Sequence, residues 1–257
     1  MKNLSDIMNN QDLLSIILTY IGIINIKDIR TISKLFLDTC KKIDWKGFKI
    51  ILSDDIKKTW CSSFPNTKSI DVYCKNHSDS YKGLKYLLQE HLIQELKIKI
   101  HPINYIDCVF QSFQINKLKT LVIDGCSGMT NEFLGYFEHI EELDINLCIS
   151  IDDLNSLKGD NLRKLCISNC YYISDIPYYP KLTNLNIYYT DIIKLPCEYT
   201  HFIILNVDYT LINYNFFEHI IHIDNLSIRK CENITWECII KLFERKIITL
   251  DTLNKIL

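Results

Sequence analysis

A short apolar pattern recurs six times between residues 118 and 231 of this 257-residue chain and limits what the chain can fold into. The pattern is Leu-x-x-Leu-x-Ile-x-x-Cys, with other aliphatic residues or Phe at some positions and Thr in place of some Cys. Its copies begin at Leu118, Ile140, Leu162, Leu182, Phe202 and Ile223. The second aliphatic residue returns every 20 to 22 residues. Such a period predicts one structural unit per copy, and the units must stack because one copy cannot bury its apolar face alone.

The pattern resembles the leucine-rich repeat, and the resemblance implies a solenoid of the α/β class. Each copy is expected to form a short parallel strand on the concave side of the solenoid. Both Leu positions and the Ile should point inward and the residues between them outward, because side chains alternate along a strand. The chain would return along the convex side through short helices, 3₁₀ turns or extended segments.

The return segments differ in composition from copy to copy. Residues 131–139 and 235–246 are predicted to contain helices, the second with an apolar face. That face consists of Trp236, Ile239, Ile240 and Phe243. The middle copies carry Pro177, Pro180 and Pro196 instead, and proline disfavours a helix interior, so extended or 3₁₀ returns are expected there.

Weaker matches extend the pattern in both directions and suggest how the chain is divided. Leu96 and Ile98 fit it well, Ile70 and Val72 fit it loosely, and Leu250 belongs to a last copy that starts at Ile247. We therefore predict repeats over residues 67–257, a linker or transition over residues 51–66, and a separate helical segment over residues 1–50.

Four of the eleven cysteines occupy the last position of the pattern. A small residue with a weak donor fits where the chain turns inward, and it can bond the backbone of the neighbouring loop. No C-x-x-C motif occurs, Cys166 is expected to face outward while Cys170 faces inward, and Cys74 with His77 lacks a second pair at metal-binding spacing. We expect no metal, no disulfide framework, and a reducing compartment, the cytoplasm, with the nucleus left open.

Composition argues against several functional classes. The net charge of −2 and the pI near 6.4 do not predict nucleic-acid binding. Seven glycines and no G-x-G-x-x-G motif argue against a nucleotide cofactor. The apolar run at residues 13–24 is too short to span a bilayer, and no nucleophile–base motif is evident. We expect a protein that is not an enzyme and has no cofactor, nucleic-acid partner or membrane partner.

Residues 12–45 resemble an F-box, a helical motif that binds the Skp-type adaptor of cullin–RING ubiquitin ligases. The resemblance rests on DLL at 12–14, ILTYI at 17–21, DI at 28–29, SKLF at 33–36 and a later Trp45. It implies that apolar side chains of this segment bind the adaptor. These are Leu13, Leu14, Ile17, Leu18, Ile29 and Phe36.

The repeats carry a second resemblance that agrees with the first. The block after Cys126, Cys170 and Cys231 resembles the C-x-x-[IL]-[ST] signature of the cysteine-containing repeat subtype, which is common in F-box proteins. Together these resemblances imply a substrate-recognition subunit of a ubiquitin ligase that is monomeric outside its complex and whose repeats bind a target protein. The alternative is a leucine-rich-repeat scaffold without a ubiquitin role, with the N-terminal helices as a cap on the solenoid.

Outward positions of the expected strands suggest where a target would bind. Neighbouring tyrosines resemble the composition of binding hot spots, so we predict a contact centre on the concave face. Its residues are Tyr188, Tyr189, Tyr209, Asn186, Asn206 and Arg229. Glu141, Glu142 and Asp144 are expected to form an acidic end of the same face.

Overall fold

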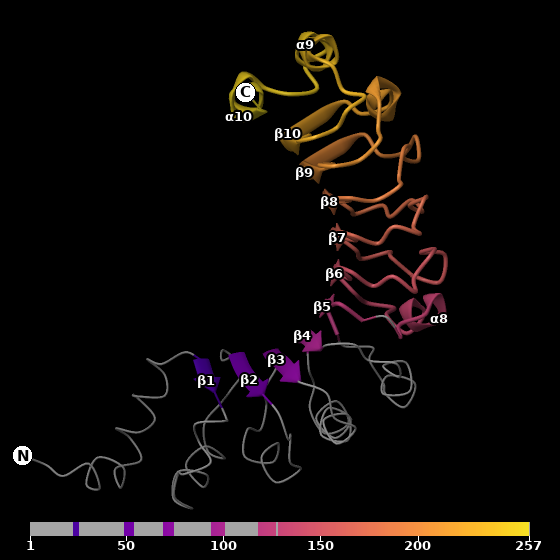
Figure 1. The fold of residues 1–257 in the computed structure, drawn as a ribbon, viewed down its shortest axis with the longest axis vertical. Coiled ribbons are helices and arrows are strands. Elements are labelled where there is room, and N and C mark those ends of the chain that lie inside the picture. Colours follow the sequence, from indigo (N-terminus) through magenta and orange to yellow (C-terminus); the bar gives the residue numbers. More distant parts are fainter. Residues whose placement is uncertain are drawn as a thin grey trace, which may run out of the picture.

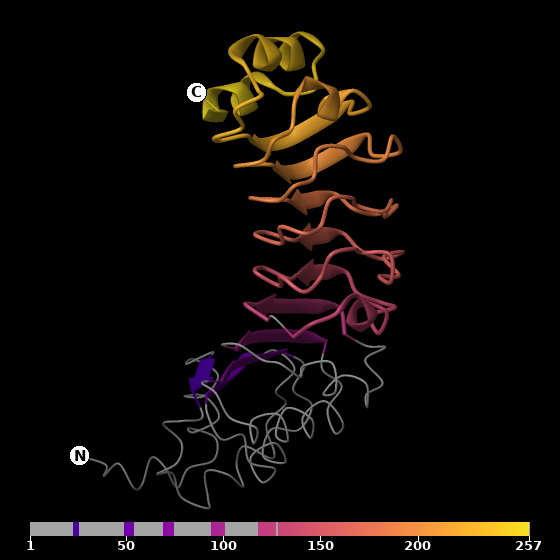
Figure 2. The same ribbon diagram turned by 45° about the vertical axis from the view of Figure 1, so that its right-hand side comes forward.

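The computed structural model describes residues 23–25, 49–53, 69–74, 94–100, 118–126 and 128–256. Across these residues the chain forms a parallel β-solenoid whose ten strands make one sheet in the order of the sequence. The strands line the inner side of a curved stack, and the return segments of residues 128–249 lie on the outer side (Figure 1). Figure 2 shows strands β4 to β10 one above another, with their arrows pointing the same way.

The strands are short, and few helices accompany them. The strands are β1 (Ile23–Asn25), β2 (Lys49–Ser53), β3 (Ser69–Cys74), β4 (Glu95–Ile100), β5 (Thr120–Asp124), β6 (Glu142–Asp144), β7 (Lys164–Cys166), β8 (Asn184–Asn186), β9 (His201–Asn206) and β10 (His222–Ser227). The helical elements are α8 (Asn131–Leu134), the 3₁₀ helix η2 (Tyr214–Phe217), α9 (Trp236–Glu244) and α10 (Leu250–Ile256). None of the described helices has the length and apolar run needed to cross a membrane.

The repeat pattern sets the register of the sheet. The second Leu of each copy pairs with its counterpart in the next copy, as Leu143 does with Leu165 and Leu165 with Leu185. These residues and the first Leu and Ile positions are buried in one continuous core between the sheet and the return segments. The predicted parallel solenoid and its inward residues are therefore confirmed for strands β5 to β10.

Simple alternation does not explain why both Leu positions are buried, because residues three apart on a regular strand face opposite sides. At or near the start of strands β5 to β9, two successive amides share one carbonyl of the preceding repeat. Thr183 and Asn184, for example, both donate to the carbonyl of Arg163 at 3.0 Å. This bulge inserts one extra residue between the two Leu positions, so two neighbouring side chains of each repeat project from the concave face.

The last position of the pattern links neighbouring repeats. The Cys170 thiol donates to the carbonyl of Ile145 at 3.0 Å, and the Cys231 thiol donates to that of Val207 at 3.0 Å. Thr190 instead bonds within its own repeat, to the carbonyl of Ile187 at 2.8 Å. The expected bond to the neighbouring loop is thus confirmed for cysteine, whereas the shorter threonine side chain bonds back to its own turn.

The return segments agree with their predicted types. A four-residue helix, α8, follows the first full copy, and residues 171–200, which carry the three prolines, return through turns without a helix, as predicted. Helix α9 begins after Thr235, whose hydroxyl accepts a hydrogen bond from the Cys238 amide as an N-cap. Its buried residues are Ile239 and Leu242, whereas Trp236 is 50% exposed. Of the predicted apolar face of α9, Ile239 contacts the core, whereas Ile240 and Phe243 are also exposed, so the prediction holds only in part.

The sheet begins further toward the N-terminus than the predicted start of the repeats at residue 67. Strand β2 pairs in parallel with β3, with Ile50 opposite Ile70, and β1 pairs with β2, with Ile24 opposite Ile50. Both strands carry the two-residue aliphatic alternation of the pattern but lack its final Cys or Thr, so the full pattern does not predict them. Strand β1 thus lies within residues 1–50, the segment that was predicted to be helical. The residues of the two predicted helices beyond this strand lie outside the described residues.

The last strand is covered by the C-terminal residues. Ile223 donates to the carbonyl of Ile247 at 2.8 Å and forms a parallel bridge with Ile248. Leu250 then begins α10 and is 60% exposed, so it does not continue a strand as expected. Thr249 caps this helix by accepting from the Thr252 amide at 3.2 Å, which ends the strand after a single bridge.

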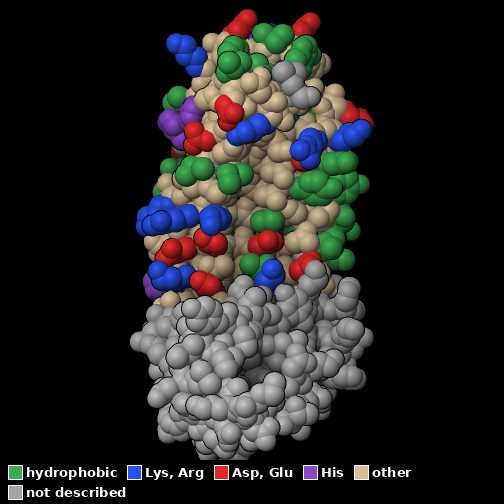
Figure 3. Space-filling model, turned by 90° about the vertical axis from the view of Figure 1, so that its left-hand side faces the viewer, with side chains coloured by type: hydrophobic (Ala, Val, Ile, Leu, Met, Phe, Trp, Pro, Cys, Tyr) green, Lys and Arg blue, Asp and Glu red, His purple; other side chains and the backbone are tan. Residues whose placement is uncertain are grey.

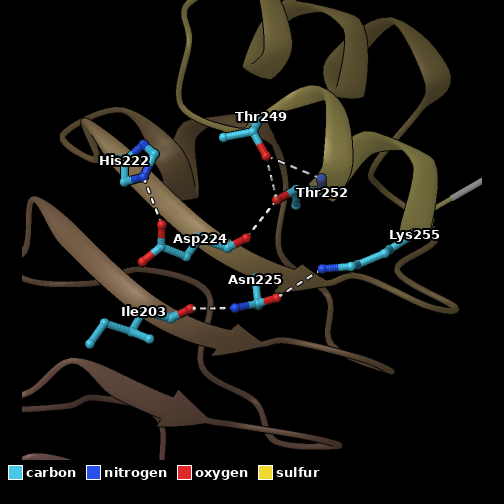
Figure 4. A network of polar contacts seen from close by, with 7 residues as sticks. All are labelled: Ile203, His222, Asp224, Asn225, Thr249, Thr252 and Lys255. Atoms are coloured by element: carbon cyan, nitrogen blue, oxygen red, sulfur yellow. Dashed lines mark hydrogen bonds and ion pairs between the residues drawn. The ribbon is translucent and has the colours of Figure 1, made fainter.

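A polar network fastens α10 to the edge of β10, as Figure 4 shows. The Thr252 hydroxyl donates to the carbonyl of Asp224 at 2.6 Å, and the Lys255 ammonium contacts the Asn225 amide oxygen at 3.4 Å. The Asn225 amide nitrogen in turn donates to the carbonyl of Ile203 on β9 at 3.3 Å. The Thr252 contact occupies a backbone carbonyl that the edge strand would otherwise offer to another chain.

Replacing Thr252 by valine should lower the free energy of unfolding by about 1 kcal/mol, because the Asp224 carbonyl loses its donor in this part-buried contact. Chemical denaturation followed by circular dichroism measures the change. Thr252→Ser keeps the hydroxyl and should recover most of the loss. Equal destabilisation by valine and serine would mean that side-chain packing, and not this hydrogen bond, fastens α10.

Candidate functional site

A distinctive turn follows the strand in each repeat from β5 to β10. The residue just before the final Cys or Thr has a positive φ in every copy. These residues are Gly125, Leu147, Asn169, Tyr189, Tyr209 and Lys230. Glycine and asparagine tolerate this left-handed conformation, but a bulky side chain there costs about 1 to 2 kcal/mol. Two tyrosines therefore occupy positions at which the backbone is strained.

Four tyrosines from these turns contact one another and form what we call the tyrosine cluster: Tyr171, Tyr188, Tyr189 and Tyr209. The ring centroids of Tyr188 and Tyr209 are 5.3 Å apart, those of Tyr171 and Tyr189 are 5.5 Å apart, and Tyr189 lies 6.2 Å from Tyr209. Tyr171, Tyr189 and Tyr209 are 39%, 46% and 44% exposed. The cluster is thus an ordered aromatic surface in contact with solvent.

The cluster lies beside the concave face and not at its centre. Strand β8 ends at Asn186 and β9 ends at Asn206, so Tyr188, Tyr189 and Tyr209 belong to the turns beyond the strand ends. Figure 3 shows hydrophobic side chains in a column along the right edge of this face. The structure brings the three predicted tyrosines together, but at the edge, because the strands are shorter than the pattern suggested.

The predicted asparagines hold these turns in place. The side-chain oxygen of Asn186 accepts from the Tyr188 amide at 3.0 Å, and that of Asn206 accepts from the Asp208 amide at 3.0 Å. Asp208 is buried and accepts from the Arg229 amide at 2.6 Å. Asn186, Asn206 and Arg229 therefore adjoin the tyrosine cluster, and their described bonds position its backbone.

Tyr171 belongs to the cluster but was not predicted from the sequence. It directly follows the buried Cys170 of its own repeat, and its ring reaches the turn of the next repeat at Tyr189. The sequence marks it only by its place directly after the pattern cysteine, Cys170.

The predicted acidic end of the concave face is largely neutralised by lysines. Glu141 pairs with Lys119 and Glu142 pairs with Lys164, each at 2.6 Å. The hydrogen bond from Lys119 lowers the pKa of Glu141, and the nearby charge of Arg163 acts in the same direction. Asp144 differs, since burial raises its pKa. The charges on this face therefore alternate between strands, and the expected acidic patch is not present in this form.

The repeat thiols are protonated at neutral pH. Burial raises the pKa of Cys126 and Cys170 to about 12 and that of Cys166 to about 11. Cys170 is buried and Cys166 is partly exposed on the concave side, as their positions in the pattern predicted. In the described part of the chain the cysteines are free, and no group of three or more His, Cys, Asp or Glu side chains is placed to hold a metal ion.

The six predicted adaptor-binding residues lie outside the described residues, so the structure does not place them. They are Leu13, Leu14, Ile17, Leu18, Ile29 and Phe36. Comparison of the chain with protein-family models and with curated protein sequences gives no match.

The backbone strain at the turns can be measured at Lys230, which has φ 56° and an exposed side chain. Lys230→Gly should raise the free energy of unfolding by about 1 kcal/mol, because glycine adopts this conformation without steric cost. Lys230→Ala keeps the β-carbon and should give no gain. A glycine variant that is no more stable than the alanine variant in chemical denaturation would show that the turn is unstrained.

Proposed function

We propose that this chain is a leucine-rich-repeat protein that acts by binding another protein, with the tyrosine cluster as the centre of the contact. The observation that carries the proposal is the cluster itself. Three of its four tyrosines are exposed yet in contact with neighbouring rings, and Tyr189 and Tyr209 occupy strained backbone positions. Strained residues tend to gather at functional sites, and tyrosine is enriched among residues that dominate binding energy.

The repeat assignment is supported by sequence and architecture together. The pattern keeps its register through six copies, and each copy contributes one parallel strand to a curved stack. Cys148, Cys170 and Cys231 each bond the carbonyl of the preceding repeat, which gives the cysteine position a structural role. Extended concave surfaces built this way serve as binding surfaces in repeat proteins.

Affinity capture can test the binding function. Proximity labelling with the full chain would identify target proteins, which would then be purified and tested directly. We expect Tyr188→Ala combined with Tyr209→Ala to reduce capture of such a target, because both rings of the closest pair are lost. Unchanged capture by this double variant would refute the assignment of the contact centre.

Within this function, we propose that the chain serves as the substrate-recognition subunit of a cullin–RING ubiquitin ligase. The support is the F-box resemblance of residues 12–45 and the agreement of the cysteine-containing repeat signature with it. The N-terminal segment would bind the Skp-type adaptor and the repeats would hold the substrate. The protein would then act by placing its target near the active site of another enzyme.

One observation favours a second candidate, a repeat scaffold without a ubiquitin role. Strand β1 lies inside the F-box-like segment and joins the same sheet as the repeats. Residues 21–26 also satisfy the first part of the repeat pattern, with Ile21, Ile24 and Ile26. A segment of this kind would cover the open end of the solenoid, as terminal repeats must.

A pull-down with the purified Skp-type adaptor separates the two candidates. The wild-type chain should bind the adaptor, and Leu14→Asp combined with Ile17→Asp should abolish binding, because apolar anchors dominate such interfaces. Circular dichroism must show that the double variant keeps its fold. Absence of wild-type binding, or equal binding by a folded double variant, would leave the scaffold function.

A further inference from the structure

Helix α9 carries an apolar stripe that is not covered by the core. Trp236, Ile240 and Phe243 are 50%, 44% and 39% exposed. They are four and three residues apart, so on a helix with 3.6 residues per turn they fall within an arc of about 60°. The buried residues Ile239 and Leu242 lie to one side of this arc and contact the core. The helix therefore presents a continuous apolar stripe to solvent.

The stripe lies on the side of α9 that faces away from the preceding repeat. Lys241 lies over the ring of Tyr214 at 5.8 Å, and Arg245 donates to the Tyr214 hydroxyl at 3.1 Å and to the Glu218 carbonyl at 3.0 Å. Tyr214 begins η2, the return segment of the preceding repeat, so these two cations mark the flank that faces it. The apolar stripe is on the opposite flank. Figures 1 and 2 show α9 at the end of the stack, with no described element beyond it.

An apolar outer face is unusual at the end of a solenoid. Inside the stack each repeat is covered by the next, whereas terminal repeats need a polar outer face to stay soluble. Exposed apolar patches mark sites of interaction, and tryptophan is enriched among the residues that dominate binding energy. The stripe with Trp236 at its start is therefore a candidate contact surface, separate from the tyrosine cluster.

The charges beside the stripe restrict what can occupy it. Glu237 and Glu244 are exposed on the flank of α9 next to the stripe, seven residues or roughly 10 Å apart along the helix. Among the described residues neither carboxylate has an ion-pair or hydrogen-bond partner. The cations Lys241 and Arg245 are engaged at Tyr214. Figure 3 shows hydrophobic and acidic side chains together at this end of the molecule. The stripe is thus bordered by negative charge.

A helix with a basic flank matches this surface better than the other possible occupants. A second copy would bring the same carboxylates and no cation from α9, and an anionic membrane surface would repel them. The apolar stripe of another helix also repeats every three or four residues, so it can pack on α9 with about 8 to 10 Å between the axes. Basic residues seven apart on that helix would reach both carboxylates.

We propose that the outer face of α9 binds an amphipathic helix of another protein that carries basic residues seven apart beside its apolar stripe. The apolar side chains pack on Trp236, Ile240 and Phe243, and the basic ones pair with Glu237 and Glu244. This second surface adds to the proposed function and does not depend on the tyrosine cluster.

A fluorescein-labelled peptide tests the inference by fluorescence anisotropy with the full chain. The probe is acetyl-Ala-Ala-Gln-Leu-Lys-Ala-Lys-Leu-Ala-Ala-Leu-Lys-Ala-Lys-Gln-Ala-amide, whose leucines form one helical stripe with lysines seven apart on both flanks. We expect saturable binding. Replacing the lysines by glutamates, or the leucines by glutamines, should weaken binding at least about tenfold, because each change removes one of the two matched features.

Variants of the chain locate the contact. Ile240→Ser should weaken peptide binding about tenfold, because an apolar anchor is lost. Glu237→Gln combined with Glu244→Gln should weaken it about fivefold at low salt and little at high salt, because salt screens exposed charges. Ile193→Ser and Glu132→Gln are matched controls, an exposed isoleucine of a return segment and an exposed glutamate of α8, and should bind normally.

Reversing the charge gives the sharpest result. Glu237→Lys combined with Glu244→Lys should prefer the glutamate peptide to the lysine peptide, with an unchanged circular dichroism spectrum. Absence of binding by the wild-type chain, or equal binding of the three peptides, would overturn the inference. Self-association, or binding to phosphatidylcholine vesicles, that Ile240→Ser abolishes would also overturn it, by assigning the face to a second copy or to lipid. Tyr188→Ala with Tyr209→Ala should leave peptide binding intact, so failure of the tyrosine cluster and failure of this inference are observed separately.

Discussion

Truncating Leu165 to alanine should lower the free energy of unfolding by about 3 to 5 kcal/mol. Leu165 is 1% exposed at the centre of the stack and pairs with Leu143 and Leu185 on the neighbouring strands. Its loss leaves a cavity bounded by framework residues of both neighbours, which the sheet register prevents from collapsing. Each repeat contacts only adjacent repeats, so a central defect weakens two interfaces. Chemical denaturation monitored by circular dichroism measures the effect.

Ile204→Ala is the matched control for this truncation. Ile204 is an aliphatic residue of β9 whose side chain is 44% exposed on the concave face. Its truncation should change stability by less than about 0.5 kcal/mol, as is usual at surface positions. Similar destabilisation by the two substitutions would mean that the inward and outward positions of the repeat pattern have been assigned incorrectly.

Replacing Tyr189 and Tyr209 together by glycine should reduce the affinity for a captured target by about a hundredfold or more, as expected for two hot-spot residues. The same change should alter stability by less than about 1 kcal/mol, because relief of left-handed strain offsets the lost ring contacts. Both residues have positive φ, at 54° and 59°. Titration calorimetry with the purified target, beside chemical denaturation of each variant, measures the two effects.

Tyr172→Ala is the control for the tyrosine cluster. Tyr172 is 66% exposed, and no ring contact of it falls among the described residues. Its removal should leave target affinity unchanged. If Tyr172→Ala weakens binding as much as the glycine pair does, exposed tyrosine in general, and not the ordered cluster, governs binding. If the glycine pair binds normally, the cluster has no part in target recognition.

The sequence alone predicted the central part of the fold, because the repeat pattern specifies which side chains are buried. Leu143, Ile145 and Cys148 are all buried, as their positions required. The bulge that makes this possible is a backbone feature, and no side chain encodes it. Because of this bulge, both Arg163 and Lys164 project outward. Regular alternation along a strand would have placed these two neighbouring side chains on opposite sides of the sheet.

The features that the sequence did not predict depend on contacts between elements. Helix α9 is amphipathic, but which of its apolar residues face the core depends on how the last repeat supports it, and Ile240 remains 44% exposed. Glu141 and Glu142 are paired with lysines, and these ion pairs form because neighbouring strands bring Lys119 and Lys164 beside them. Ion-pair partners on neighbouring strands depend on the register of the sheet. The repeat pattern gives that register only after the strands of successive copies have been aligned.

Hydrogen exchange of the full chain with and without its captured target is the most direct test of the proposed binding surface. If the tyrosine cluster is the contact centre, the target should slow exchange of backbone amides in residues 186–190 and 206–210. Exchange in the return segments of residues 152–160 and 191–199 should not change. Protection confined to those return segments would contradict the account, because it would place the target on the opposite side of the solenoid.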